Sequence, residues 1–148
     1  MKLNPAQREA LRMKYGGHCA YCGSELPAKW HADHADPVRR DGSFVRDPKA
    51  AGRSLRVWKK NGRLRDPHND CRNNLMPSCI RCNILKSSAS VEGFRSMLTY
   101  FAHSIPSIPT YSHVHHLMRF GKLSIDATPV VFWFERYADK DNVCAKVQ

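Results

Sequence analysis

Two stretches of equal spacing, residues 19–22 (CAYC) and 79–82 (CIRC), decide the fold of this chain. Together they supply four thiolates, the number that one tetrahedral structural Zn²⁺ requires. An ion shared by both pairs would close a long loop, and closing a long loop removes more chain entropy than closing a short one. The alternative is two metal-free cysteine pairs with a redox role. We favour one structural zinc ion, with the ligands Cys19, Cys22, Cys79 and Cys82.

The size of the chain fits a metal-braced domain. At 148 residues and 42% hydrophobic composition it can build only a modest core, and small cores often recruit a metal. The other two cysteines, Cys71 and Cys144, have no partner at ligand spacing and are expected to be plain thiols. There is no apolar run of about 20 residues and no apolar N-terminal leader. We therefore expect a cytoplasmic protein in a reducing compartment.

The charge of the chain points to a polyanionic partner. The formal net charge is +11, and residues 35–73 hold eleven Lys/Arg against five Asp/Glu, a net +6. This concentration favours nucleic acid binding, although a generally basic soluble surface would give the same total. The same segment shows no clean periodicity, so we predict a long irregular insertion of the kind that is usually functional or mobile.

Helix and strand signals flank this insertion. Asn4 can cap a helix that ends at Gly16-Gly17, with Gln7 completing a capping box. Short strands are predicted over 29–34 and 75–78, and helices from about Asn83 and from Ser90. After a linker at 105–109, residues 110–120 look helical, and 130–134 read as a buried strand.

Polar residues cluster around the cysteine pairs in a specific order. Asp33 and His34 precede the insertion, Asn74-Leu75-x-Pro-x leads into the second cysteine pair, and Asn83 and Lys86 follow that pair. Spanning Cys19 to Lys86, this pattern resembles the HNH endonucleases, also called ββα-metal or His-Me finger nucleases. The nearest pattern is their zinc-containing branch, which includes phage and homing-type nucleases and Holliday-junction resolvases.

The resemblance implies a role for each residue. His34 would be the general base that activates water, since imidazole exchanges protons near neutral pH. Asp33 and Asn83 would hold one catalytic Mg²⁺, which Mn²⁺ could replace, and hard oxygen ligands suit that ion. Asn74 would brace the loop that carries the base. The products would be 5′-phosphate and 3′-hydroxyl DNA ends, and the setting a phage or mobile element in a bacterial host.

Neighbouring strand residues point to opposite faces, which constrains this site. Asp33 and His34 can serve one ion only if His34 lies at the end of its strand, where the chain turns. His31 shares a face with Asp33, so we keep it as a supporting residue and back-up base. Each residue also has a simpler interpretation: Asn83 could merely cap a helix, Asn74 shape a turn, and His34 be an exposed loop residue.

Several basic residues are candidates for DNA contact. Lys86 is expected to reach a phosphate, and Arg39 and Arg40 to hold the backbone near the cut. The run from Arg53 to Arg65, which contains Trp58, is expected to contact DNA, with a solvated loop as the alternative. The histidines of the 110–120 helix could bind a metal, but an ordinary surface helix is favoured.

The sequence therefore predicts a small α+β protein. Residues 1–100 would form a zinc-stapled ββα-metal (HNH) domain with an N-terminal helix and a basic insertion at 35–73. Residues 101–148 would form a C-terminal extension, a helix followed by a strand. The expected activity is metal-dependent hydrolysis of DNA, and homodimerisation is left open. The rival functions are a non-catalytic zinc-stabilised DNA-binding module, a branched-DNA resolvase within the nucleases, and a redox or metal-handling protein.

Overall fold

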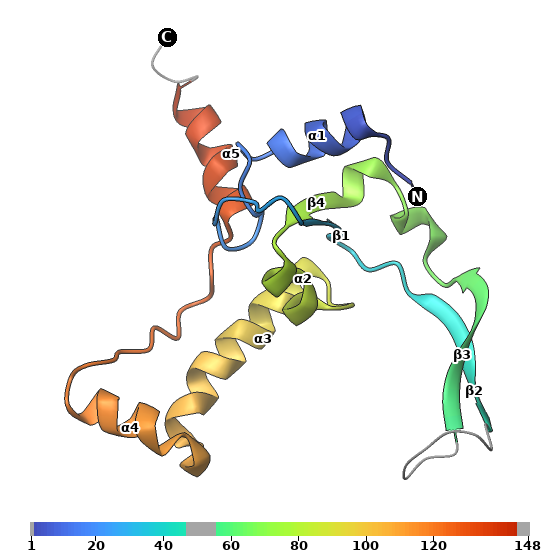
Figure 1. The fold of residues 1–148 in the computed structure, drawn as a ribbon. Coiled ribbons are helices and arrows are strands. Elements are labelled where there is room, and N and C mark those ends of the chain that lie inside the picture. The colour runs from blue at the N-terminus through green and yellow to red at the C-terminus, as the bar shows by residue number, and fades with distance from the viewer. Residues whose placement is uncertain (1, 47–55, 145–148) are drawn as a thin grey trace.

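The computed structural model describes residues 2–46 and 56–144, and the start of the predicted basic run, Arg53 to Leu55, lies outside them. Within the described residues the chain is a mixed α/β fold with two small antiparallel sheets, one pairing β1 with β4 and the other β2 with β3 (Figure 1). The helices and strands are α1 (Pro5–Met13), β1 (His31–His34), β2 (Arg40–Arg46), β3 (Arg56–Leu64), β4 (Leu75–Ser78), α2 (Ile80–Lys86), α3 (Val91–Ser104), α4 (Ser112–Arg119) and α5 (Trp133–Cys144).

The β1–β4 pair and helix α2 form the centre of the fold. Both predicted strands are confirmed, and they pair antiparallel from His31 opposite Ser78 to His34 opposite Leu75. Helix α2 follows β4 after a single residue, Cys79, whose sulfur accepts from the Cys82 amide as an N-cap. The helix begins earlier than expected, so Asn83 lies inside it, and the interpretation of Asn83 as a helix cap is wrong.

Helix α1 begins as its sequence predicts. Asn4 is the N-cap, and it exchanges both capping-box hydrogen bonds with Gln7. Long basic side chains then tie the helix to the strands. Lys14 Nζ donates to the Leu75 carbonyl (3.0 Å), and the Arg8 guanidinium donates to the Trp30 carbonyl (2.7 Å) while lying over the Trp30 ring. These contacts fix α1 beside β4, although none of its side chains is fully buried.

Aromatic side chains from distant parts of the chain fill the core. Tyr21, Trp30 and Phe94 are buried there together with Phe132 from the C-terminal region. Tyr21, Phe94 and Phe132 lie with their ring centroids 5.5 Å apart. The C-terminal region is therefore packed into the same core as the first cysteine pair.

The prediction of a buried strand at 130–134 is wrong. Residues 130–132 form no strand, and helix α5 begins at Trp133. The backbone amides of Trp133 and Phe134 donate to the Tyr21 and Ala20 carbonyls, so this turn of the chain is hydrogen-bonded to the cysteine-containing loop instead of to a sheet. A short apolar run reads the same in a buried strand and at a buried helix start, which explains the error.

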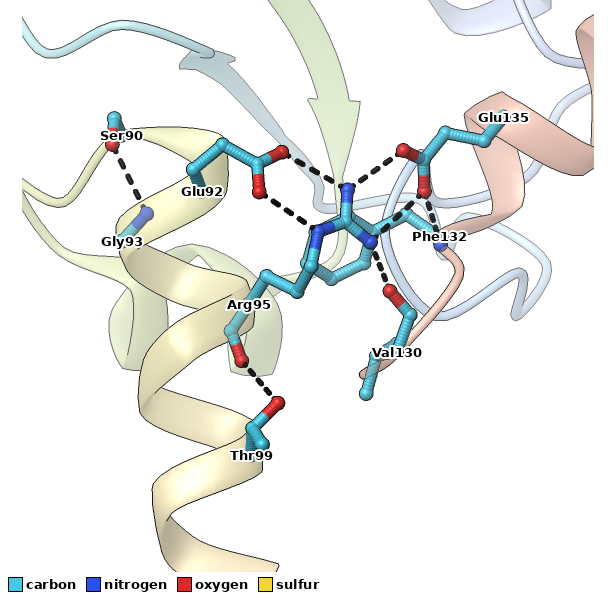
Figure 2. A network of polar contacts seen from close by, with 8 residues as sticks. All are labelled: Ser90, Glu92, Gly93, Arg95, Thr99, Val130, Phe132 and Glu135. Atoms are coloured by element: carbon cyan, nitrogen blue, oxygen red, sulfur yellow. Dashed lines mark hydrogen bonds and ion pairs between the residues drawn. The ribbon is translucent and has the colours of Figure 1, made fainter. Parts of the chain in front are cut away.

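An arginine fixes the C-terminal region to α3. The Arg95 guanidinium lies between two carboxylates, Glu92 on its own helix and Glu135 on α5, and it also donates to the Val130 carbonyl (Figure 2). The same group stacks over Phe132, with its carbon 4.7 Å from the ring centroid. Glu135 in turn accepts from the Phe132 amide. This network holds Phe132 in place within the core.

Strands β2 and β3 correct the expectation for residues 35–73. The segment is not irregular throughout: it contains a two-stranded ribbon that projects away from the rest of the fold (Figure 1). Nearly every residue of β3 is exposed. A strand exposed on both faces needs no alternation of apolar and polar residues, so periodicity could not reveal it.

The remaining helices agree largely with expectation. Helix α3 begins after the N-cap Ser90, whose side chain accepts from the Gly93 amide, and it runs past residue 100 to Ser104. The predicted linker forms two short 3-10 turns, Ile105–Ser107 and Pro109–Tyr111, and α4 follows. Among the helices in the described part of the chain, none combines the length and apolar character needed to cross a membrane.

Candidate metal centre and adjoining polar site

The four predicted cysteine ligands lie together. The sulfur atoms of Cys19, Cys22, Cys79 and Cys82 are all within 4.8 Å of one another. The Cys22 and Cys79 sulfurs are 3.9 Å apart. Tetrahedral zinc with Zn–S bonds of about 2.3 Å would place its sulfurs about 3.8 Å apart, so the cluster fits such an ion. The cluster can therefore hold a structural metal such as zinc.

The local backbone shapes this cluster. Cys19 and Cys22 lie on a tight loop between α1 and β1, while Cys79 caps α2 and Cys82 lies in its first turn. The Cys79 amide donates to the Cys19 sulfur at 3.3 Å, and the Cys82 amide to the Cys79 sulfur at 3.4 Å. Amide hydrogen bonds of this kind stabilise thiolates, which are the metal-binding form of cysteine.

The thiols of the cluster strongly influence one another. A hydrogen bond with Cys82 lowers the pKa of Cys19, and the same bond, followed by burial, raises the pKa of Cys82. Without a cation, a proton stays on one sulfur so that its neighbour can ionise. A divalent cation would remove the need for that proton. Cys71 is exposed and outside the cluster, as predicted, and the thiol of Cys144 belongs to the undescribed side chains.

Directly beside the cluster, Asp33 lies in a buried polar group. Its Oδ2 accepts a 2.5 Å hydrogen bond from the Tyr21 hydroxyl and pairs with Lys86 Nζ at 3.1 Å. Burial, and then the charge of Asp33, raise the pKa of Tyr21, so the hydroxyl keeps its proton and donates. The other carboxylate oxygen, Oδ1, has no hydrogen-bond partner among the described residues.

Lys86 has a different role from the one expected. Its side chain is 0% exposed, and its ammonium pairs with Asp33 and donates to the His34 carbonyl at 2.7 Å. A fully buried ammonium cannot reach a DNA phosphate, so the predicted phosphate contact is wrong. The bonds of Lys86 instead dock helix α2 onto the end of β1.

His34 is the last residue of β1, as the strand geometry required. Its Nε2 lies 3.1 Å from Asp70 Oδ1, and the two side chains are 29% and 23% exposed. Sequence reasoning did not identify Asp70. It lies in the basic segment with no motif around it, and only the return of the chain toward β4 brings it to His34. Because Nε2 faces a carboxylate, Nδ1 is the ring nitrogen left for another partner.

Asn74 makes the contacts expected of a loop brace. Its Oδ1 accepts from the Asp36 amide at 2.9 Å, and its Nδ2 donates to the Asp36 and Asn69 carbonyls at 2.8 Å each. The Ala35 amide also donates to the Asn74 carbonyl. The turn that follows His34 is therefore tied to the segment that precedes β4.

Asn83 lies three residues before Lys86 on α2, and residues three apart lie on the same side of a helix. Since Lys86 reaches β1, this side of α2 faces the end of that strand. The Asn83 side chain is partly buried and makes no hydrogen bond within the described residues. Its amide is therefore uncommitted on the side of α2 that also carries Lys86.

The other predicted site residues lie further out. Arg39 Nε and Nη2 both bind Asp66, at 2.8 Å and 3.2 Å, which raises the pKa of Arg39. Arg40 begins β2 and is exposed, and His31 is exposed at the start of β1. His31 pairs with Ser78, the residue before Cys79, but its own side chain is exposed.

The described residues contain a single cluster of His, Cys, Asp or Glu able to surround an ion, namely the four cysteines. The tail histidines form no such cluster among the described residues, and α4 buries none of its residues. Comparison with family models, with curated proteins and with solved structures finds no match to this chain.

Proposed function

We propose that this chain is a DNA endonuclease of the HNH type, which hydrolyses phosphodiester bonds with His34 as general base. One observation carries the proposal. An antiparallel strand pair runs through the second cysteine pair into α2, and Lys86 of that helix binds both the Asp33 carboxylate and the His34 carbonyl. In this ββα arrangement Asp33 and His34 share the end of β1 with a helix that also carries Asn83, which supports the proposal.

The His34–Asp70 pair supports the role of a base. A carboxylate at one ring nitrogen orients the imidazole and stabilises its protonated form. The second nitrogen, Nδ1, would take a proton from a water molecule that attacks the phosphorus. Asn74 would hold the turn after His34 so that the ring keeps this orientation, and Asp70 acts through His34 as a positioning residue.

Asp33 and Asn83 are the residues that would hold a catalytic divalent cation. The donor set fits Mg²⁺, because Asp33 Oδ1 and the Asn83 amide oxygen are uncommitted hard ligands, and Mg²⁺ commonly binds one or two such groups plus water and phosphate. When bound, such an ion supplies positive charge for the scissile phosphate and the leaving oxygen. Lys86 and Tyr21 would hold the carboxylate through Oδ2 and leave Oδ1 available as a ligand.

Plasmid nicking tests this proposal, with two histidines of β1 as a matched pair. Wild-type protein should nick supercoiled plasmid in Mg²⁺ or Mn²⁺, and His34→Ala should lower the rate by at least about a hundredfold. His31→Ala should leave the rate within a few-fold of wild type. Asp70→Asn should lower the rate about tenfold or more without changing the metal content of the protein.

Three outcomes of the nicking experiment would contradict the proposed roles. Equal activity in wild type and His34→Ala would refute His34 as the base, and loss in His31→Ala alone would move that role to His31. DNA binding without cleavage in any divalent cation would favour the non-catalytic zinc-stabilised module. The zinc content of every variant should be measured, so that loss of the cysteine-bound metal is not mistaken for loss of the base.

A further inference from the structure

The two faces of the β2–β3 ribbon differ in chemistry. Its register places Gly42 opposite Lys60, Phe44 opposite Trp58 and Arg46 opposite Arg56. Opposed residues of an antiparallel pair share a face, and every second residue of a strand returns to it. One face, here called the aromatic–basic face, is therefore formed by Gly42, Phe44, Arg46, Arg56, Trp58 and Lys60. The opposite face carries Ser43, Val45, Val57 and Lys59.

Two large aromatic rings lie at the centre of the aromatic–basic face. Phe44 is 59% exposed and Trp58 is 42% exposed. Their ring centroids are 5.1 Å apart in an edge-to-face arrangement. The ribbon projects away from the β1–β4 pair and helix α2 (Figure 1). These rings are thus presented to solvent on an arm instead of stabilising the core.

Gly42 shows how Trp58 is held on this face. A Cβ at residue 42 would lie 2.9 Å from the Trp58 ring and 2.4 Å from the Lys59 carbonyl oxygen, closer than real Cβ contacts come. The indole therefore lies close against Gly42 of β2, in space that only a glycine leaves open. This contact fixes the ring on the ribbon surface before any partner binds.

The ribbon also has charge that it does not neutralise itself. Residues 40–46 and 56–65 contain seven Lys/Arg and one acid, Asp41, a net +6. That acid is already bound by Asn61 and Arg65. A polyanion bound along the ribbon would match this excess of positive charge.

We propose that the ribbon is a DNA-binding arm that lays its aromatic–basic face into a groove of duplex DNA. The major groove is about 12 Å wide and admits a two-stranded ribbon. The nine residues of β3 span about 30 Å, which equals roughly nine base pairs. Basic side chains would bind phosphates at the groove edges, and the aromatic pair would contact the groove interior. The inference rests on the proposed function for its substrate, DNA, but names a surface separate from the cleavage site.

Adjacent lysines on opposite faces provide the test. The His34→Ala protein, which should bind without cutting, is titrated with a fluorescent 30-base-pair duplex at several salt concentrations, with and without a further substitution. Lys60→Ala should weaken binding several-fold and lower the slope of log affinity against log salt by about 1. Lys59→Ala removes the same charge from the other face and should weaken binding clearly less.

The aromatic pair is tested in the same background. Phe44→Ala with Trp58→Ala should weaken duplex binding by roughly tenfold or more, while the zinc content and the thermal unfolding midpoint stay unchanged. Trp58 emission in the parent protein should be quenched by duplex DNA, and Trp58→Phe should abolish that change. Single-stranded DNA, anionic lipid vesicles and poly-glutamate are titrated alongside, and the duplex should be bound most tightly.

Three results would overturn the proposal: equal losses for Lys59→Ala and Lys60→Ala, unchanged duplex affinity in the aromatic double variant, or tighter binding of another polyanion than of duplex. Failure of the nuclease proposal gives a different pattern. In that case plasmid remains intact with wild-type protein, while the ribbon variants still lose duplex affinity.

Discussion

The β1–β4 pair and the β2–β3 pair are both antiparallel, yet the molecule uses them in opposite ways. The first consists of two four-residue strands, and residues of β4 are almost all buried against the cysteine cluster and core. The second consists of longer strands exposed on both faces. Local backbone structure is the same, so the difference comes from what each pair is packed against.

The lysines of the two regions make the contrast concrete. Lys86 is buried and its charge is matched by Asp33, whereas Lys60 is exposed on a ribbon with excess positive charge. A buried charge requires a partner within the protein, while an exposed charge can be matched by solvent ions or by an external polyanion. The charge of Lys86 is therefore matched within the protein, whereas the ribbon carries an excess of positive charge that a polyanion could match.

The largest effect should follow from removing a metal ligand in the core. Cys82→Ser should abolish tight zinc binding and the cooperative unfolding transition, because a structural metal often contributes most of the folding free energy of a small domain. Cys71→Ser, an exposed cysteine outside the cluster, is the control and should change neither. In both variants, zinc binding is measured as zinc content and the unfolding transition is followed by circular dichroism. A Cys82→Ser protein that retained one zinc ion and the wild-type melt would show that the cluster does not brace the fold.

A smaller but still large effect should come from the buried ion pair. Lys86→Met should lower the free energy of unfolding by about 3–5 kcal/mol, since it leaves the Asp33 carboxylate buried with only Tyr21 as a donor. Lys60→Met makes the same chemical change on the ribbon and should have little effect on stability. Urea denaturation measures both.

A second substitution sharpens that comparison. Adding Asp33→Asn to Lys86→Met removes the stranded charge and should recover part of the lost stability. If the stability losses of Lys86→Met and Asp33→Asn simply add, the two residues are not coupled. The contrast between a core whose charges are paired internally and a ribbon with excess positive charge then loses its main support.

The smallest effect is expected in the ribbon itself. Trp58→Ala removes a large side chain, but one that packs on Gly42 and Phe44 instead of on the core. The free energy of unfolding of the protein should change by no more than about 0.5 kcal/mol. Urea denaturation followed by circular dichroism would show this, and a loss of several kcal/mol would mean that the ribbon supports the core.

Much of the centre of the fold was predictable from local pattern. Two Cys-x-x-Cys pairs predicted the cluster, and the capping residues Asn4 and Ser90 predicted two helix starts. The polar site was predicted less completely. Asp70 has no sequence signal as the partner of His34, and Lys86 looks the same in sequence whether its ammonium is buried or faces DNA. Such assignments depend on tertiary contacts that no local pattern records.

By itself, the sequence determined which residues can bind a metal, where the chain can begin a helix and where positive charge is concentrated, because these properties belong to residue type and short-range spacing. Only the tertiary structure decided which groups are buried and which meet. It buried Phe132 in the core just before helix α5 and paired the Lys86 ammonium with the Asp33 carboxylate. It also left the aromatic–basic face of the ribbon exposed to solvent. Burial and pairing depend on segments far apart in sequence, and each is settled only when the whole chain has packed.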